Sequence, residues 1–171
     1  MNIGVKVNSQ ERMWPFVIKT YKEIMCSYPT GVSIVTTMDQ DKPVGLTVNS
    51  FASVSLEPLL VSWCIDKKSS SLQAFHKSDT FAVNILSGHQ KAECFIFADS
   101  KESDRFSKTS WERSANQLPI LKDVFAVLEC KKVQEIEAGD HIVLIGKVID
   151  LHKTDHKPML YYQRNVSVVP E

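Results

Sequence analysis

The sequence lacks an excess of charge of either sign, because 20 lysines and arginines balance 20 aspartates and glutamates over 171 residues. A protein that binds nucleic acid or a membrane surface mainly through electrostatics carries a basic excess. The balance therefore argues against both kinds of partner. Any anion that this protein binds has to be held by local geometry.

Close cysteine pairs and long apolar runs are missing too. Cys26, Cys64, Cys94 and Cys130 form no CxxC or CxxH pair, so no structural metal is expected. Each lies in an apolar stretch, which predicts four buried free thiols. No stretch approaches the roughly 20 apolar residues of a membrane helix, and the first ten residues show no secretory signal. These absences predict a cytoplasmic protein.

Several familiar motifs are absent as well. The sequence contains no GxGxxG, GxxxxGK[ST] or GxSxG motif, so it lacks the common dinucleotide, P-loop and serine-hydrolase fingerprints. Strands and helices do not alternate regularly, which argues against a doubly wound parallel sheet. No cysteine lies beside an evident base, so nucleophilic catalysis is not expected.

What the sequence does contain is a series of β-branched segments bounded by turns. The expected strands span residues 31–37, 43–50, 59–65, 80–86, 124–136, 141–151 and 159–168. The first two are expected to form a hairpin, and the later ones a meander.

Helices are few and short in this prediction. Apolar residues recur at helical spacing over 13–26, after a polar arm at 1–12. A serine N-cap at 69–71 precedes a second short helix, and 89–98 forms a third. Residues 99–118 are expected to be a long structured loop.

Several strands are apolar on both faces, as in Ile142-Val143-Leu144-Ile145. In an antiparallel protein this pattern suggests a closed barrel whose outer face is also covered. A subunit interface is the expected cover. The prediction is a mainly β protein, an antiparallel β-barrel with peripheral helices, with one domain at 13–171 and a homodimeric assembly.

Short polar side chains are concentrated in residues 45–55, GLTVNSFASVS, where a predicted strand ends. Such a segment offers closely spaced donors and acceptors, which a planar heteroaromatic ligand such as a flavin ring requires. On residue types alone, the simpler interpretation is a strand end whose hydroxyls bond their own backbone.

A second candidate site is Lys68-Ser69-Ser70-Ser71. Hydroxyls at a helix N-terminus next to lysines suit a phosphate, although a plain N-cap with solvated lysines is the simpler interpretation. The third candidate is His141, at a Gly139-Asp140 turn, which could hydrogen-bond a ligand or move a proton near neutral pH. An exposed turn histidine is again the simpler interpretation.

Taken in order, these segments resemble the flavin reductase family, the small reductase components of two-component flavin monooxygenases. The resemblance covers roughly residues 20–163. It is carried by YPTGVSIVTT at 28–37, GLTVNSFASVSLEP at 45–58, FAVNIL at 81–86, DRF at 104–106 with Trp111, LEC at 128–130, GDHI at 139–142 with Ile145-Gly146, and PMLYY at 158–162.

The resemblance implies a split β-barrel of the FMN-binding type that reduces FMN or FAD with NADH or NADPH and supplies reduced flavin to a separate oxygenase. By position, the implied flavin contacts are Thr47, Val48, Asn49, Ser50, Ser53 and Val54, with Lys68, Ser69 and Ser71 at the phosphate and Arg105 and Phe106 over the ring. The implied nicotinamide contacts are His141, Tyr161 and Tyr162. Of these only His141 is a candidate for a catalytic role, because hydride transfer needs aligned rings more than an acid or a base.

The chain departs from the family pattern in two places. Pro58-Leu59 stands where the family often has Pro-Pro, and Gln163-Arg164 follows the Tyr-Tyr pair where Arg-Gly is common. The choice between NADH and NADPH is therefore open, as is that between FMN and FAD. Two alternatives remain: a flavin carrier or redox store without reductase turnover, and an interaction domain without a cofactor.

Overall fold

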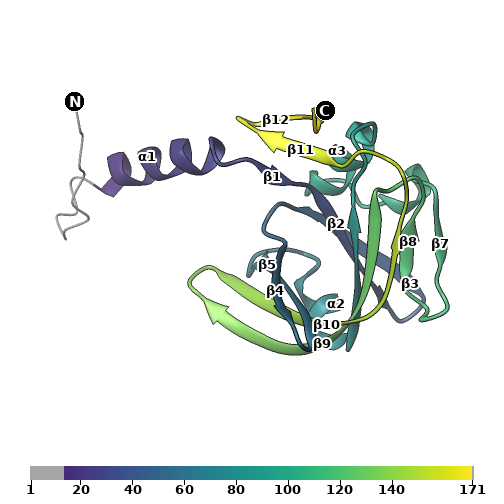
Figure 1. The fold of residues 1–171 in the computed structure, drawn as a ribbon. Helices are drawn as coiled ribbons and strands as arrows, with labels where there is room; N and C mark the ends of the chain where they lie inside the picture. The colour runs from purple at the N-terminus through teal and green to yellow at the C-terminus, as the bar shows by residue number, and fades with distance from the viewer. Residues whose placement is uncertain (1–13, 171) are drawn as a thin grey trace.

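A computed structural model describes residues 14–170 of the chain. The predicted arm at 1–12 and the predicted helix start at Met13 lie outside the described residues. Figure 1 shows the helices α1 (Trp14–Cys26), α2 (Leu72–Lys77) and α3 (Lys91–Ala98). The strands are β1 (Thr30–Gly31), β2 (Ser33–Asp39), β3 (Lys42–Val48), β4 (Ala52–Leu56), β5 (Leu59–Asp66), β6 (Thr80–Ile85), β7 (Trp111–Arg113), β8 (Pro119–Leu121), β9 (Ala126–Ala138), β10 (His141–Lys153), β11 (Met159–Tyr162) and β12 (Asn165–Val168).

Seven strands form the main sheet, in the order β3-β2-β6-β9-β10-β5-β4, and its neighbouring strands are antiparallel. β1, β11 and β12 form a second small sheet, and β7 and β8 form a third. β3 and β4 are the two edges of the main sheet, yet only residues 49–51 separate them along the chain.

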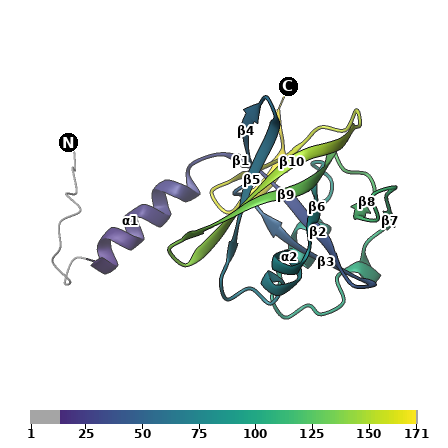
Figure 2. The same cartoon turned by 90° about the horizontal axis from the view of Figure 1, so that it is seen from below.

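That short connection forces the sheet to curl. Four Cα–Cα steps reach at most about 14 Å, so the end of β3 has to lie close to the start of β4. Ser50 fastens the closure, because the backbone N–H of Cys64 in β5 donates to its Oγ at 2.9 Å. The predicted antiparallel barrel is confirmed, and Figure 2 shows the strands wrapped around one another.

Strand alternation divides the apolar residues into two clusters. Val35 and Val83 belong to a cluster that also holds Trp63, fully buried with its ring edge-on to Phe75 and Phe81 at 4.9 and 5.7 Å between centroids. This cluster draws on strands all round the sheet, so it fills the barrel.

The neighbouring residues Ile34 and Ala82 point the other way. They belong to a cluster with Phe97 of α3 and Leu121 of β8. Part of the cover that the sequence assigned to a second subunit is thus supplied by the chain itself.

Three sequence predictions about the elements were wrong, and so was one about the cysteines. β4 was missed, because its small polar residues were assigned to a strand end. Residues 99–118 include β7 and are not a continuous loop. The strand predicted at 159–168 is the β11–β12 hairpin, turned by Gln163 and Arg164, both at positive φ. Of the four cysteines, which are all free, only Cys94 and Cys130 are buried.

Gly146 of β10 provides a test of the barrel packing. A Cβ at this position would lie 2.9 Å from the Cβ of Cys130 and overlap the ring of Phe81, and both neighbours are buried too deeply to move aside. We expect Gly146→Ala to lower the free energy of unfolding by about 2 kcal/mol, the usual cost of overpacking, in urea denaturation.

Gly31→Ala is the matched control, because no atom beyond the adjacent residues of the chain lies within 4 Å of a Cβ built there. It should change stability by less than about 0.5 kcal/mol. Equal stability of the two variants would contradict a packed barrel interior at Gly146.

Candidate functional site

A cleft of about 290 Å³ opens beside the start of β3. Its walls come from three segments that are far apart in the sequence: β3, the serine turn before α2, and the loop after α3. The lining residues are Pro43, Val44, Gly45, Ser70, Ser71, Ser100, Lys101, Glu102, Ser103, Arg105 and Phe106. Of the predicted flavin contacts, Ser71, Arg105 and Phe106 line this cleft, whereas the predicted contacts from Thr47 to Val54 do not.

The serine turn is organised by Asp66, the last residue of β5. The Asp66 backbone oxygen accepts from the N–H of Ser69 at 2.9 Å, and its carboxylate accepts from the N–H of Lys68 at 2.7 Å. These two N–H groups, which precede the first turn of α2, are therefore already occupied.

Ser71 occupies the N-cap position of α2, as predicted, but its hydroxyl makes no capping hydrogen bond. The residue is 4% exposed and lines the cleft. Ser69 differs, because its Oγ accepts from the N–H of Ser71 at 3.3 Å. Ser71 is consequently the predicted phosphate contact whose hydroxyl is least committed to the fold.

Lys132 of β9 holds the other end of α2, a contact that sequence reasoning missed. Its ammonium donates to the backbone oxygens of Phe75 and His76 at 2.9 and 2.7 Å and to Glu135 at 2.6 Å. Cations are favourable at a helix C-terminus, where carbonyl groups lack partners. A lysine in a strand gives no sequence signal of this role. The contact fixes α2, and with it the serine turn.

Glu135 also accepts a hydrogen bond from His76, at 2.8 Å. Burial by itself would raise the pKa of Glu135, but the hydrogen bonds from Lys132 and His76 outweigh burial and hold the pKa below its usual value. The carboxylate therefore stays ionised, completing the contact set that anchors α2.

Arg105 joins the loop after α3 to the edge of the barrel. Its two Nη groups donate to the backbone oxygens of Gly45 and Asp99, each at 2.8 Å. Its Nε is buried and has no hydrogen-bond partner within residues 14–170. The Nε–H group is thus a buried donor of a residue that lines the cleft.

Phe106 is half-buried between two other rings. Its centroid lies 5.0 Å from that of Phe97 and 5.4 Å from that of Trp111, both edge-on. Gly45 permits this packing, because a Cβ there would lie 2.9 Å from the ring of Phe97. The ring anchors the loop at the mouth of the cleft.

The remaining predicted flavin contacts have mixed surroundings. Thr47 donates to the backbone oxygen of Cys94 at 2.8 Å, and Ser50 is bound to Cys64, so both hydroxyls serve the fold. Val48 is buried in the barrel core, while Asn49 is exposed in the turn. Ser53 lines a different, apolar groove, and its neighbour Val54 is half exposed on β4. Their assignment to a flavin remains a prediction.

His141 lies at the β9–β10 turn, beside the serine turn. It pairs with Asp66 in the strand ladder, and the backbone N–H of Lys67 donates to Asp140 at 2.9 Å. His141 Nδ1 contacts the Asp140 carboxylate at 2.8 Å. That hydrogen bond is the main cause of the lowered pKa of Asp140, and it fixes the orientation of the imidazole ring.

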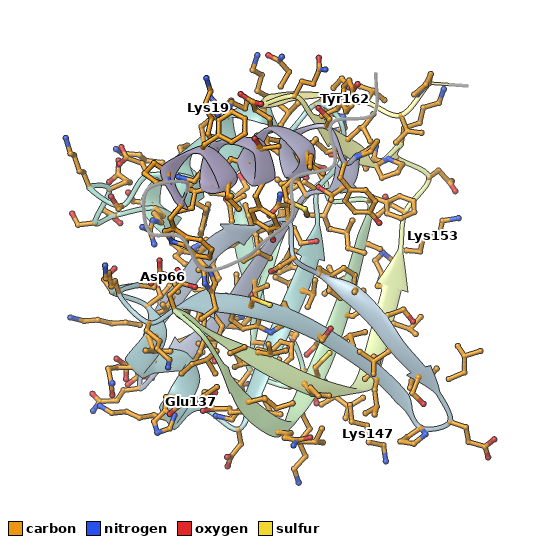
Figure 3. The ribbon with its side chains drawn as sticks, turned by 90° about the vertical axis from the view of Figure 1, so that its left-hand side faces the viewer. Lys19, Asp66, Glu137, Lys147, Lys153 and Tyr162 are labelled. Atoms are coloured by element: carbon orange, nitrogen blue, oxygen red, sulfur yellow. The ribbon has the colours of Figure 1, made fainter. Side chains whose placement is uncertain are left out.

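Tyr161 and Tyr162 belong to β11, in the other sheet. Tyr161 pairs with Thr30 and packs on the outer apolar cluster, while Tyr162 is 41% exposed. Figure 3 shows Tyr162 near α1, well apart from Asp66, which marks the position of His141 in the ladder. One chain therefore does not bring the three predicted nicotinamide contacts together.

The described residues offer few groups for other chemistries. Within residues 14–170, no three His, Cys, Asp or Glu side chains come together as metal ligands. Burial raises the pKa of the Cys130 thiol to about 12 and also raises that of Cys94, so neither is a thiolate near neutral pH. No helix in the part of the chain that the structure describes is long and apolar enough to span a membrane.

The family model described as "Flavin reductase like domain" matches residues 25–170. The chain belongs to the flavin reductase-like domain family. It is 39% identical over 145 residues to a flavin reductase of Pseudomonas putida, covering 84% of this chain and 85% of that protein.

This flavin reductase-like domain is also 40% identical over 147 residues to the reductase component of the flavin-dependent trigonelline monooxygenase of Acinetobacter baylyi. The match covers 85% of this chain but only 47% of that protein, so the chain spans about half of that relative's length.

Two solved structures of the family have the same fold. The nitrilotriacetate monooxygenase component B from Mycobacterium thermoresistibile superposes with a TM-score of 0.87 and 32% identity, covering 92% of this chain and 89% of that one. The NADH:FAD oxidoreductase of Streptomyces globisporus, in complex with NAD and FAD fragments, superposes with a TM-score of 0.85 and 30% identity, covering 98% of each chain.

Lys132→Met tests the anchoring of α2. The variant loses three hydrogen bonds of a charged donor, and such bonds contribute about 1.5–3 kcal/mol each to stability when the charge is paired. Because water replaces part of this contribution, we expect a loss of about 2 kcal/mol in the free energy of unfolding, measured in urea at pH 7. Lys131→Met is the control, since Lys131 is exposed on the same strand and should cost less than about 0.5 kcal/mol.

The contribution of Glu135 to stability should depend on pH. A carboxyl group with a lowered pKa stabilises the fold above its unfolded pKa, and this contribution is lost as the pH falls through the folded value. The stability difference between the parent and Lys132→Met should therefore shrink below about pH 4. A difference independent of pH would show that Glu135 takes no part.

Proposed function

We propose that the protein is an NAD(P)H:flavin oxidoreductase that reduces FMN or FAD and supplies reduced flavin to a separate oxygenase. The observation that supports this most directly is the family match over 25–170, together with a cleft at which Ser71, Arg105 and Phe106 meet. Relatives at 36–40% identity are named as flavin reductases or as reductase components of flavin-dependent monooxygenases.

The cleft fits a phosphorylated flavin by its donors. Ser70, Ser71 and Lys101, which carry hydroxyl and ammonium donors, are among its lining residues, and the Arg105 Nε, which has no partner within residues 14–170, belongs to the same loop as Lys101. Phosphate oxygens accept hydrogen bonds strongly from such groups. We assign the phosphate to this set, and keep Lys68 and Ser69 as its flanking contacts on the serine turn.

A bound flavin supplies the hydride acceptor, and the protein has to align it with the pyridine nucleotide and exclude water. Phe106, held between Phe97 and Trp111, supports the cleft mouth as a fixed wall. His141 is oriented through Asp140, and we assign it as a nucleotide contact beside the serine turn.

The homodimer is part of this proposal. His141 and the Tyr161-Tyr162 pair lie in separate sheets of one chain, so a nucleotide that touches all three requires two copies. We further propose a cytoplasmic location, because the four cysteines are free and thiols persist in reducing compartments.

A flavin carrier without turnover is the second candidate. The Gln163-Arg164 turn favours it, because both residues adopt positive φ where the family commonly has Arg-Gly. Such a turn next to Tyr162 alters the surface expected to receive the nicotinamide nucleotide.

The deciding experiment is spectroscopic. FMN or FAD is added to the protein, and the oxidation of NADH or NADPH is followed at 340 nm. The proposal predicts flavin-dependent oxidation with at least one pair. Flavin binding without oxidation of NADH or NADPH would support the flavin carrier instead. Absence of flavin binding would exclude both the reductase and the carrier.

The double variant Ser69→Ala with Ser71→Ala tests the phosphate contacts. Hydrogen bonds to charged groups contribute about 1.5–3 kcal/mol, so we expect FMN affinity to fall roughly ten- to hundredfold, while unfolding stability falls by less than about 1 kcal/mol. Riboflavin, which lacks the phosphate, should bind the parent and the variant equally, as measured by flavin fluorescence quenching.

Ser110→Ala, at an exposed position outside the cleft, is the control and should leave FMN affinity unchanged. If the double variant loses stability as much as affinity, the two serines serve only as structural caps.

A further inference from the structure

The helix α1 has no buried residue. Figures 1 and 2 show it extending away from the barrel. Large apolar side chains on this segment are 39–62% exposed, among them Trp14, Phe16, Ile18, Tyr21 and Ile24. An isolated helix of this length is marginal in water, and an apolar patch of this size marks an interaction surface.

A second unpartnered surface lies on the barrel. An apolar groove of about 290 Å³ lies between the β4–β5 hairpin and the C-terminal half of β10. Its lining residues include Phe51, Leu56, Leu60, Val148 and Leu151. Leu56 is 82% exposed and Leu151 60% exposed. The groove has no covering element among the described residues.

An acidic cleft adjoins this groove and shares Leu151 with it. Glu112, Glu129 and Asp150 contribute three carboxylates to its lining, together with His152. Glu129 and Asp150 face each other as partners in the β9–β10 ladder, and like charges placed so are destabilising. We call the groove and the cleft together the Leu151 surface.

Two of the three carboxylates of this cleft have no cationic partner among the described residues. Glu129 is 7% exposed, and its carboxylate accepts a hydrogen bond from Ser114 at 2.7 Å. Glu112 pairs with Lys122 at 3.4 Å. Neither Glu129 nor Asp150 has a salt bridge within residues 14–170. A buried carboxylate without a counter-charge is costly, so the cleft favours a positively charged occupant.

α1 carries that charge next to its apolar residues. Lys19 and Lys22 lie three residues apart and therefore share one face of the helix. Lys19 is 4.0 Å from Glu23 in an exposed pair, while Lys22 has no salt bridge in the described chain. An apolar helix with two lysines matches a surface made of an apolar groove and an acidic cleft.

We propose that α1 of one copy docks on the Leu151 surface of a second copy, with its apolar side chains in the groove and Lys19 and Lys22 at the acidic cleft. A two-fold arrangement makes this contact twice, because each copy provides one arm and one surface. The inference rests on the proposed homodimer and specifies which surfaces form it.

The area is sufficient for a stable dimer. Aromatic side chains bury roughly 150–250 Å² each, so two arms of half-exposed residues contribute on the order of 1,000 Å². The surfaces that they cover add a comparable amount, and stable interfaces bury about 1,200–2,000 Å² in total.

A charge exchange tests this docking in the full-length protein. One variant carries Lys19→Glu with Lys22→Glu, and the other carries Glu112→Lys with Asp150→Lys. Each variant alone places like charges at both contacts of its own homodimer. In the mixed dimer both contacts again join opposite charges. Lys77→Glu with Lys91→Glu is the control, since it makes the same charge change at exposed positions elsewhere.

Sedimentation equilibrium at low salt is the measurement. We expect a dimeric parent and control, at least a tenfold weaker dimer for each variant alone, and recovery of the dimer when the two variants are mixed. A monomeric parent, variants that dimerise as the parent does, or a mixture that stays monomeric would each overturn the docking. FMN reduction by the parent is measured separately, so a dimer without activity would refute the proposed function and leave the docking intact.

Discussion

The closure of the main sheet is the constraint on which the rest of the structure depends. Residues 49–51 join the two edge strands, so a seven-stranded sheet cannot stay open. Closure creates an interior that Trp63, Phe75 and Phe81 fill. It also exposes the outer face of β2 and β6, which α3 and the segment around β8 then cover. The candidate site lies where this outer layer meets the β3 edge.

This position explains why residues from three separate segments line the cleft. The loop after α3 is fastened to β3 by Arg105, and α2 is fastened to β9 by Lys132. In both attachments a charged side chain donates hydrogen bonds to backbone oxygens. These bonds position the loop after α3 and the helix α2 on the barrel although neither pairs with a strand of the sheet there. The zero net charge of the chain is consistent with this arrangement, because the hydrogen-bond donors at the cleft are concentrated there and do not require an excess of basic residues over the whole surface.

The sequence was sufficient to predict the barrel, because β-branched strands apolar on both faces require closure. The residue types also marked the serine turn, whereas Arg105 was marked only through the resemblance to the flavin reductase family. β4 could not be predicted from pattern, since Ser53 and Ser55 look like loop residues and its pairing with β5 is a long-range property. The β11–β12 turn was missed because Gln163 and Arg164 adopt positive φ without glycine.

Other features depended on three-dimensional proximity alone. No local signal connects Lys132 to the backbone of Phe75. Nothing in the sequence shows that Tyr162 and His141 belong to different sheets. Glu129 and Asp150 have no salt bridge within residues 14–170, and their position opposite each other is known only from the ladder register. The sequence therefore identified chemical groups, while the fold decided which of them meet.

The central claim is that the serine turn and the Arg105 loop hold the phosphate of a flavin in one cleft. Hydrogen exchange followed by mass spectrometry, with FMN and with riboflavin, tests it most directly. The account predicts that FMN protects residues 69–72 and 100–106 and that riboflavin protects these segments much less. Equal protection by both ligands, or protection confined to other parts of the chain, would contradict it.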